Sequence, residues 1–380
     1  MLLVLLLGVV SLCGDVVYEG ARAVTGPFLY SLGASAAVVG FVAGLGELAC
    51  YALRLVSGHF ADRTSRYWLL VFLGYGMIVA VPFLAFARHW QLAAVLLILE
   101  RMGKAIRTPS REVILSSAGS SMGRGWAFGV HEAMDQVGAV AGPLIFAAGV
   151  AMGEGYRGGF RFMFVPFVLM LGVLAVARAK FPEPHKLEET SQPTDGKIPR
   201  AFWLYLIFAG IAICGFANFQ LVAYHLKAKS LLSEAAIPLM YAVAMGVDGG
   251  AALVVGKLYD RKGLGVLVVL PVIGIVSAPL LFSLSETGVV VGIVLWGIAL
   301  GIQETIMRAA VGDLVPLNRR GWAYGTFYAA FGLSWFAGSL AIGFLYGHSI
   351  AWVIAFSVAL QAASLPAFLI FRREIARARA

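Results

Sequence analysis

The sequence predicts an all-α membrane protein with twelve transmembrane helices in two similar six-helix halves. Two observations lead to this prediction. First, 60% of the 380 residues are hydrophobic and only 13% are charged, whereas soluble domains carry about 25% charged residues. Second, the apolar residues gather in runs of about 20 residues or more, the length that a helix needs to cross a bilayer, and short motifs recur in the same order in both halves of the chain.

The apolar runs define the expected helices in chain order. They are 2–31, 36–60, 67–87, 91–117, 125–152, 159–179, 201–228, 234–257, 264–284, 288–314, 321–347 and 350–371. The first run lacks a basic leader and is long, so we interpret it as a spanning helix. The polar, proline-rich stretch after the sixth run predicts a linker. The expected domains are an N-terminal half at 1–180, a cytoplasmic linker at 181–200 and a C-terminal half at 201–380.

The Lys and Arg residues between the predicted spans give the orientation. If the N-terminus lies inside, the outer loops carry only Arg88, Arg157, Arg161, Lys227 and Lys229, while the inner loops and the C-terminal tail carry most of the others. Cytoplasmic loops are enriched in Lys and Arg, so both termini are predicted to be cytoplasmic. This asymmetry explains the net charge of +9 without a nucleic-acid partner.

The expected helix 91–117 contains a row of charges. Glu100, Lys104, Arg107 and Arg111 follow one another at i, i+4, i+7 and i+11, and therefore share one helix face. A charge at the centre of a bilayer costs about 2.5–3.5 kcal/mol or more, so this face must meet protein or a wet cavity rather than lipid. Two interpretations follow: a polar wall of a substrate pathway, or a buried ion-pair network that fixes helix packing.

Charged residues also lie inside other predicted spans, and in the first half the embedded acids outnumber the embedded bases by one. An unmatched buried carboxylate can carry a proton near neutral pH, as a proton-coupled carrier requires. We expect ion pairs among the residues nearer the cytoplasmic end, which are Arg111, Glu112, Glu132 and Asp135. The candidates for proton coupling are the deeper acids Asp15, Glu19 and Glu47, with Glu304 as their counterpart in the second half.

Three motifs repeat between the halves. Gly58 to Arg63 matches Gly256 to Arg261, Gly125 to Gly129 matches Gly321 to Gly325, and Arg107 with Glu112 is echoed by Arg308 with Asp313. Such matches in the same order indicate duplication, and duplicated six-helix halves are one known transporter architecture with the site at the interface of the repeats.

At this point the sequence resembles the major facilitator superfamily. The residues that carry the resemblance are Gly58, Asp62, Arg63 and Arg66 in the loop after the second span, with Asp260 and Arg261 as a weaker second copy. The resemblance covers essentially the whole chain. It implies a gating role for this signature, in which the Asp caps a helix end and the basic residues pair with nearby acids. It also implies that the first, fourth, seventh and tenth helices line the cavity.

A second motif points to a subgroup. Gly138, Gly142 and Pro143 in the fifth span resemble the motif of drug/proton antiporters of the superfamily, although the glycines expected after the proline are replaced by Leu144 and Ile145. Independently of any family, the GxxxG spacing predicts close helix packing. The resemblance is to a bacterial subgroup, which implies the inner membrane of a bacterium.

Three transport functions are compatible with these residues. The first is proton-coupled export of a small organic compound by an antiporter. The second is transport of an organic anion bound by Lys104, Arg107 and Arg308, with Asn218 and Gln220 as further polar contacts in the seventh span. The third, placed last, is a metal-ion carrier using Asp15, Glu19, Glu47 and His131, because no tight His or Cys spacing supports it.

Enzymatic activity is not expected, because the sequence has no nucleotide-binding loop, nucleophile elbow or zinc-binding helix motif. We therefore predict no cofactor and no resident metal. The expected partners are a small-molecule substrate, protons and the lipid bilayer, and the expected state is a monomer.

Overall fold

The computed structural model describes residues 1–64, 66–119, 124–182, 198–315 and 320–379, and within these ranges it contains helices and no strand. The prediction of an all-α protein is therefore confirmed. The helices are α1 (Leu2–Ser31), α2 (Ala36–Thr64), α3 (Tyr67–Gly76), α4 (Ala80–Phe83), α5 (Trp90–Gly119), α6 (Arg124–Ala151), α7 (Gly155–Phe162), α8 (Phe164–Lys180), α9 (Arg200–Cys214), α10 (Phe219–Ala228), α11 (Ala236–Lys262), α12 (Val269–Leu281), α13 (Glu286–Leu314), α14 (Arg320–Tyr346) and α15 (Ile350–Arg379), with 3-10 helices η1 (Met77–Val79), η2 (Leu84–Phe86) and η3 (Gly263–Val268).

Eleven stretches of the described chain are long and apolar enough to cross a membrane. The predicted span that is not among them corresponds to α5, which has 30 residues. At about 1.5 Å per residue α5 is roughly 45 Å long, which exceeds the hydrocarbon core of a bilayer. Its charged residues, and not its length, therefore distinguish α5 from the other eleven. These residues are Glu100, Arg101, Lys104, Arg107, Arg111 and Glu112.

Several predicted spans are interrupted in the structure. The expected helix 201–228 consists of α9 and α10, separated at Gly215–Asn218. Asn218 begins the second piece: its side-chain oxygen accepts a hydrogen bond from the Leu221 backbone N–H at 2.9 Å, which is an N-cap. The expected helix 67–87 is likewise divided into α3, η1, α4 and η2. Both spans have a high mean hydropathy, so hydropathy alone did not reveal their breaks.

The chain divides into two compact units. The first unit comprises Met1–Gly33, Leu45–Ser191 and Ser233–Ala242, and the second comprises Ala34–Gly44, Gln192–Leu232 and Val243–Ala380. Two helices, α2 and α11, thus contribute residues to both units. The predicted halves at 1–180 and 201–380, joined by a linker, stay a prediction.

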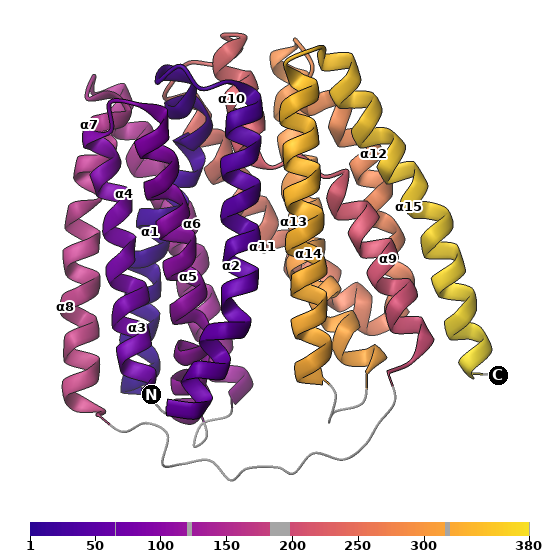
Figure 1. Cartoon of the computed structure of the whole chain (residues 1–380), viewed down its shortest axis with the longest axis horizontal. Coiled ribbons are helices and arrows are strands. Elements are labelled where there is room, and N and C mark those ends of the chain that lie inside the picture. The colour runs from indigo at the N-terminus through magenta and orange to yellow at the C-terminus, as the bar shows by residue number, and fades with distance from the viewer. Residues whose placement is uncertain (65, 120–123, 183–197, 316–319, 380) are drawn as a thin grey trace. The chain divides into compact units, whose positions relative to one another are not determined.

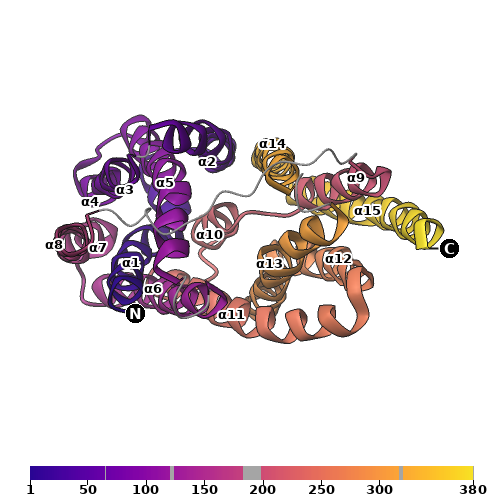
Figure 2. The same ribbon diagram turned by 90° about the horizontal axis from the view of Figure 1, so that it is seen from below.

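Helix α1 is the centre of the first unit. Most of its residues are buried, and it contacts α4, α5, α6, α7 and α8, as the view along the helices in Figure 2 shows. Two glycines of α6 allow the closest of these approaches: a Cβ at Gly138 would collide with the Leu12 carbonyl oxygen, and one at Gly142 would lie 2.8 Å from the Gly20 nitrogen. The GxxxG motif of α6 therefore brings the backbones of α1 and α6 together.

The second unit is built from packed helices, drawn in Figure 1 in pink for α9, orange for α12 to α14 and yellow for α15: α9 packs on α14 and α15, and α12 packs on α13 and α15. Aromatic side chains fill its core. The rings of Phe216 and Trp296 stack with centroids 5.7 Å apart, and the Trp296 indole donates a hydrogen bond to the Ala217 carbonyl at 2.8 Å. This bond uses a carbonyl in the break between α9 and α10, where the helical partners are missing.

Candidate functional site

The charged row of α5 lies near the middle of that helix, and a proline ties the helix to α2. Pro109 has no N–H, so the Ala105 carbonyl loses its helical hydrogen-bond partner. The Ser57 hydroxyl of α2 donates a hydrogen bond to this carbonyl at 2.8 Å. Gly58 packs beside Pro109, since a Cβ there would lie 3.7 Å from the proline Cβ. The neighbouring helix α2 thus supplies the hydrogen bond that Pro109 removes from α5, as hydrocarbon surroundings require.

A pair of glycines brings α5 against α3. A Cβ at Gly103 would lie 2.7 Å from the Gly74 carbonyl oxygen, and a Cβ at Gly74 would lie 2.6 Å from the Cβ of Arg107. Any larger residue at either position would clash with backbone or with Arg107. The approach presses Arg107 onto α3, where the next residue after Gly74 is Tyr75.

Arg107 is a buried cation with no counter-ion among the described residues. Arg107 is only 2% exposed. Its guanidinium carbon lies 4.8 Å from the ring centroid of Tyr75 and 5.4 Å from that of Tyr18. Within the described ranges no carboxylate oxygen lies within 4.0 Å of it, and its Nε and Nη1 have no hydrogen-bond partner. Two aromatic rings thus contact this charge where an acid would neutralise it.

The Tyr18 ring is shared by three cations. Lys104 Nζ lies 4.5 Å from the ring centroid and 3.4 Å from the phenolic oxygen, and the guanidinium carbon of Arg101 lies 5.4 Å from the same centroid. Lys104 itself is only partly buried. Neither Tyr18 nor Tyr75 was among the predicted site residues, because the sequence contains many aromatic residues and gives no signal that singles these two out.

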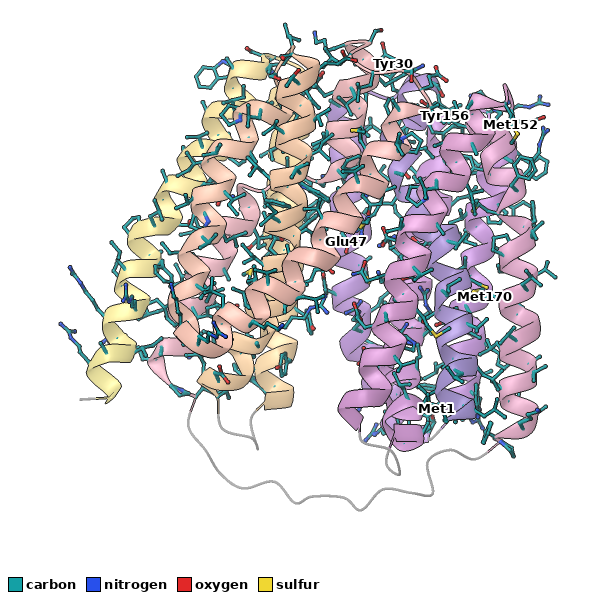
Figure 3. All side chains as sticks on the ribbon, turned by 180° about the vertical axis from the view of Figure 1, so that it is seen from behind. Met1, Tyr30, Glu47, Met152, Tyr156 and Met170 are labelled. Carbon is teal, nitrogen blue, oxygen red and sulfur yellow. The ribbon has the colours of Figure 1, made fainter. Side chains whose placement is uncertain are left out.

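Two of the four predicted proton-coupling acids are held in ion pairs. Glu47 Oε1 pairs with Arg22 and, at 3.2 Å, with Arg101. Figure 3 shows Glu47 about midway along the first unit, between Met1 at one end and Tyr30 at the other. Glu19 Oε1 lies 3.3 Å from Arg22, and its Oε2 accepts a hydrogen bond of 2.5 Å from the Tyr241 hydroxyl of the first-unit segment Ser233–Ala242. Arg101 also forms an ion pair with Glu100, at 2.7 Å.

Asp15 differs from these acids. It is 6% exposed, yet no Lys, Arg or His nitrogen in the described part of the chain lies within 4.0 Å of its carboxylate. Its Cβ lies against Gly138 of α6. Asp135, one turn before Gly138, and Lys104 are the charged groups that act most strongly on it. Asp15 thus combines burial with the absence of an ion pair, the combination expected of a proton-binding carboxyl group.

Arg111 and Asp135 join α5 to α6 beside this acid. The Arg111 guanidinium donates a 2.7 Å hydrogen bond to the Ser11 hydroxyl and lies 3.9 Å from Asp135. His131 Nδ1 lies 3.4 Å from the same carboxylate. The Ser11 hydroxyl also shares a 3.0 Å hydrogen bond with the Tyr75 hydroxyl, so this network reaches the ring on which Arg107 rests.

The other predicted residues differ in exposure. Glu112 and Glu132 have exposed side chains, as do Arg63, Arg66 and Arg261 of the loop signatures. The side chains of Asp62 and Asp260 lie outside the described residues. In the second unit Glu304 and Arg308 are exposed, Gln220 is partly exposed, and Asn218 is fully buried as a helix cap whose amide nitrogen also donates to Ser339 at 2.8 Å. No group of three or more His, Cys, Asp or Glu side chains among the residues searched is placed to hold a metal ion.

Comparison with known proteins identifies the family. The sequence matches the Major Facilitator Superfamily over residues 12–302. It is 42% identical over 367 residues to an uncharacterized protein of Mycobacterium tuberculosis strain H37Rv, with 94% of this chain and 90% of that protein covered. It is 26% identical over 363 residues to an uncharacterized MFS-type transporter of Methanocaldococcus jannaschii, with 90% and 88% covered.

A solved structure shows the same fold. A bacterial homolog of the human lysosomal transporter Spinster, in an inward-facing and unoccupied conformation, matches with a TM-score of 0.76 at 14% identity, over 99% of this chain and 97% of that one. The chain therefore belongs to the major facilitator superfamily, and the predicted fold is confirmed. It is a multi-pass membrane protein and a secondary transporter that moves a small molecule by alternating access.

Proposed function

We propose that this protein transports a small organic anion in a proton-coupled manner. Arg107 and Lys104 bind the acidic group of the substrate, and Asp15 binds the proton. The observation that carries the proposal is the burial of Arg107, at 2% exposure, without a carboxylate partner in the described part of the chain. An anion that binds beside it supplies the missing counter-charge.

Burying the Arg107 charge has an energetic cost. The penalty for burying an ion is several kcal/mol, and a buried charge normally has a partner that offsets this penalty. The two tyrosine contacts of Arg107 are worth about 0.5–2 kcal/mol each, which is less than an ion pair with a carboxylate would offset. A buried arginine without a counter-ion lowers the stability of the fold, but it is suited to binding an anion. A substrate carboxylate or phosphate forms the ion pair that the protein does not supply.

The route to Arg107 runs past Lys104. The two residues are separated by one helical turn, and Lys104 is the more exposed of them. Their side chains share the Tyr18 ring, with Lys104 Nζ at 4.5 Å and the Arg107 guanidinium carbon at 5.4 Å from its centroid. One anionic group can therefore approach both cations from the side on which Lys104 is accessible.

Asp15 is favoured over Glu19 and Glu47 as the proton site, because those two acids pair with Arg22 and Arg101. Glu304 stays a candidate in the second unit, where its side chain is exposed. Arg308 stays a predicted substrate contact. Export, antiport and a monomeric state also stay predictions from the sequence.

For location we propose the inner membrane of a bacterium with both termini in the cytoplasm. The support is the M. tuberculosis relative and the asymmetric distribution of Lys and Arg between the predicted loops.

The test uses purified full-length protein in detergent and five probes that share one phenyl ring: benzoate, benzenesulfonate and phenylphosphonate as anions, benzyltrimethylammonium as a cation, and benzyl alcohol as a neutral compound. Thermal unfolding is measured with each probe. At about 100 times its dissociation constant a bound probe stabilises the folded protein by roughly 2.7 kcal/mol. We expect at least one anion to raise the melting temperature, and the cation and the alcohol not to do so.

Two variants locate the effect. Arg107→Met should abolish stabilisation by the anion, while Arg88→Met, which removes the same charge from an exposed position, should retain it. Stabilisation by the cation alone, or an unchanged anion response in Arg107→Met, would contradict the proposal.

A further inference from the structure

Three charged side chains near the middle of α1 and α5 have no ion pair within the described part of the first unit. They are Asp15, Lys104 and Arg107, whereas Arg22, Arg101 and Arg111 each have a carboxylate within 4.0 Å. The unpaired set thus contains two positive charges and one negative charge. An arriving anion adds negative charge next to a carboxylate that has no cation of its own.

Asp15 lies close to the proposed anion site at Lys104 and Arg107. Tyr18 follows Asp15 by three residues and therefore lies one turn away on the same face of α1. Lys104 Nζ lies 3.4 Å from the Tyr18 hydroxyl. An anion bound by Lys104 and Arg107 is therefore about one helical turn from the Asp15 carboxylate, in surroundings from which most water is excluded. At such a separation like charges repel strongly in a buried site.

Several other titratable or charged groups lie around Asp15. On its own helix, Tyr18 and Glu19 are nearest, and Glu19 is held by Arg22. The elements packed on α1 contribute these titratable or charged neighbours: Lys104 and Arg111 from α5, His131 and Asp135 from α6, and Tyr75 from α3. Helix α8 packs through Met170 against Gly14 and has no titratable residue before Arg178, and α4 has none. The α7 contact with α1 is at Phe28, more than three turns away.

We infer that the protein is a proton/anion symporter, in which protonation of Asp15 and binding of the anion at Lys104 and Arg107 favour each other. This inference rests on the proposed anion site. An ionised Asp15 repels the anion, and a protonated Asp15 does not. By linkage the anion must raise the proton affinity of Asp15 by the same factor, and couplings between two ligand sites commonly amount to about 5- to 150-fold.

The sign of this coupling selects the transport mode. A carrier that binds proton and substrate together in one state moves both in the same direction. Antiport needs the two to compete, as happens when a cationic substrate occupies the proton-binding carboxylate. Lys104 and Arg107 attract an anion, so substrate and proton do not compete for Asp15 but favour each other's binding. Symport therefore departs from the antiport that the sequence predicts.

The first experiment measures binding in detergent with benzenesulfonate, benzoate and phenylphosphonate. Benzenesulfonate is the preferred probe, because its charge is constant between pH 5 and 9 and any pH effect then belongs to the protein. In wild-type protein the affinity should fall about 5- to 150-fold from low to high pH. Addition of the probe to weakly buffered protein should cause proton uptake, read with a pH electrode.

The matched variants are Asp15→Asn and Glu286→Gln. Asp15→Asn imitates the protonated carboxyl group, so it should bind the probe with the low-pH affinity at every pH and take up no proton. Glu286 is exposed in the first turn of α13, and its neutralisation should leave both readings unchanged. A role of Asp15 in folding alone would not remove the pH dependence while retaining binding.

The second experiment measures transport of the bound probe into proteoliposomes whose membrane potential is clamped with potassium and valinomycin. An acidic outer solution should drive transient accumulation in wild-type protein and in Glu286→Gln. Asp15→Asn should lose accumulation and keep downhill exchange. Proton release on binding, or accumulation driven by an alkaline outer solution, would overturn symport while leaving the anion site intact. Failure of all three anions to bind would overturn the anion site and the symport inference together.

Discussion

Arg107→Met tests whether the Arg107 charge is structurally compensated. Methionine is about as long as the aliphatic part of arginine and adapts to irregular cores, so the variant removes the charge with little change in packing. The variant eliminates two buried donors without partners, Nε and Nη1, each of which costs about 1–3 kcal/mol. It loses cation–π contacts at 4.8 and 5.4 Å, which are worth about 0.5–2 kcal/mol each. Together the donors account for about 2–6 kcal/mol gained and the contacts for about 1–4 kcal/mol lost. From the midpoints of these ranges we expect the free energy of unfolding to rise by about 1–2 kcal/mol.

Arg101→Met provides the comparison on the same helix. Arg101 lies 2.7 Å from Glu100 and 3.2 Å from Glu47, so its removal leaves acids without this partner in a buried site. Loss of one member of a buried pair costs about 3–5 kcal/mol. At least about 3 kcal/mol should therefore separate the two arginine variants, although both lose one positive charge from α5.

The assay is the melting temperature of each purified variant in detergent, together with its elution as a single species in size-exclusion chromatography. Arg88→Met serves as an exposed control and should behave as wild type. If Arg107→Met were as unstable as Arg101→Met, Arg107 would have a counter-ion that holds the fold together, and the reasoning that leads to an anion site would be refuted.

Three further outcomes follow from the packing and from the loop signature. Tyr18→Phe should weaken anion binding less than Tyr18→Leu, because phenylalanine retains the ring over Lys104 and loses only the hydroxyl; equal losses in a binding titration would mean that the ring is irrelevant. Gly142→Leu should abolish the monodisperse peak, because a side chain there collides with α1, whereas Gly172→Ala, in open space, should retain it. Asp62→Asn should leave expression intact and reduce the transport rate in proteoliposomes, and a normal rate would remove the gating role from this residue.

The sequence was sufficient for the fold because its signals are local and repeated. Apolar runs long enough to span a bilayer and duplicated loop motifs need no knowledge of tertiary contacts. The interruption of the seventh span was not predicted, because Gly215 and Asn218 lie in an otherwise apolar run. Asn218, predicted as a substrate contact, has both ends of its amide engaged, one as the cap of α10 and the other with Ser339. Its role as a substrate contact stays a prediction.

The sequence predicted the site only in part, because ion pairing depends on tertiary contacts. Helical periodicity placed Lys104 and Arg107 on one face without a structure. Which charges neutralise one another depends on where helices cross, and that is set by glycines far apart in the sequence, such as Gly74 and Gly103. The sequence left Asp15, Glu19 and Glu47 together as candidates, and only the resemblance favoured Asp15 and Glu19 as cavity residues. The structure separates Glu19 and Glu47, which are paired, from Asp15, which has no ion pair among the described residues.

The choice of tyrosine as the neighbour of Arg107 has a consequence for affinity. If a carboxylate occupied the place of Tyr75, an incoming anion would first have to break a buried ion pair worth about 3–5 kcal/mol, which corresponds to a loss of roughly 100- to 5,000-fold in affinity. An aromatic ring stabilises the cation through its face and leaves the in-plane N–H donors of the guanidinium available. Nε and Nη1 of Arg107 are such donors: both are buried, and neither has a hydrogen-bond partner among the described residues. Tyr18 and Tyr75 thus hold the cation without using these donors, and in the proposed mechanism the substrate anion accepts from them.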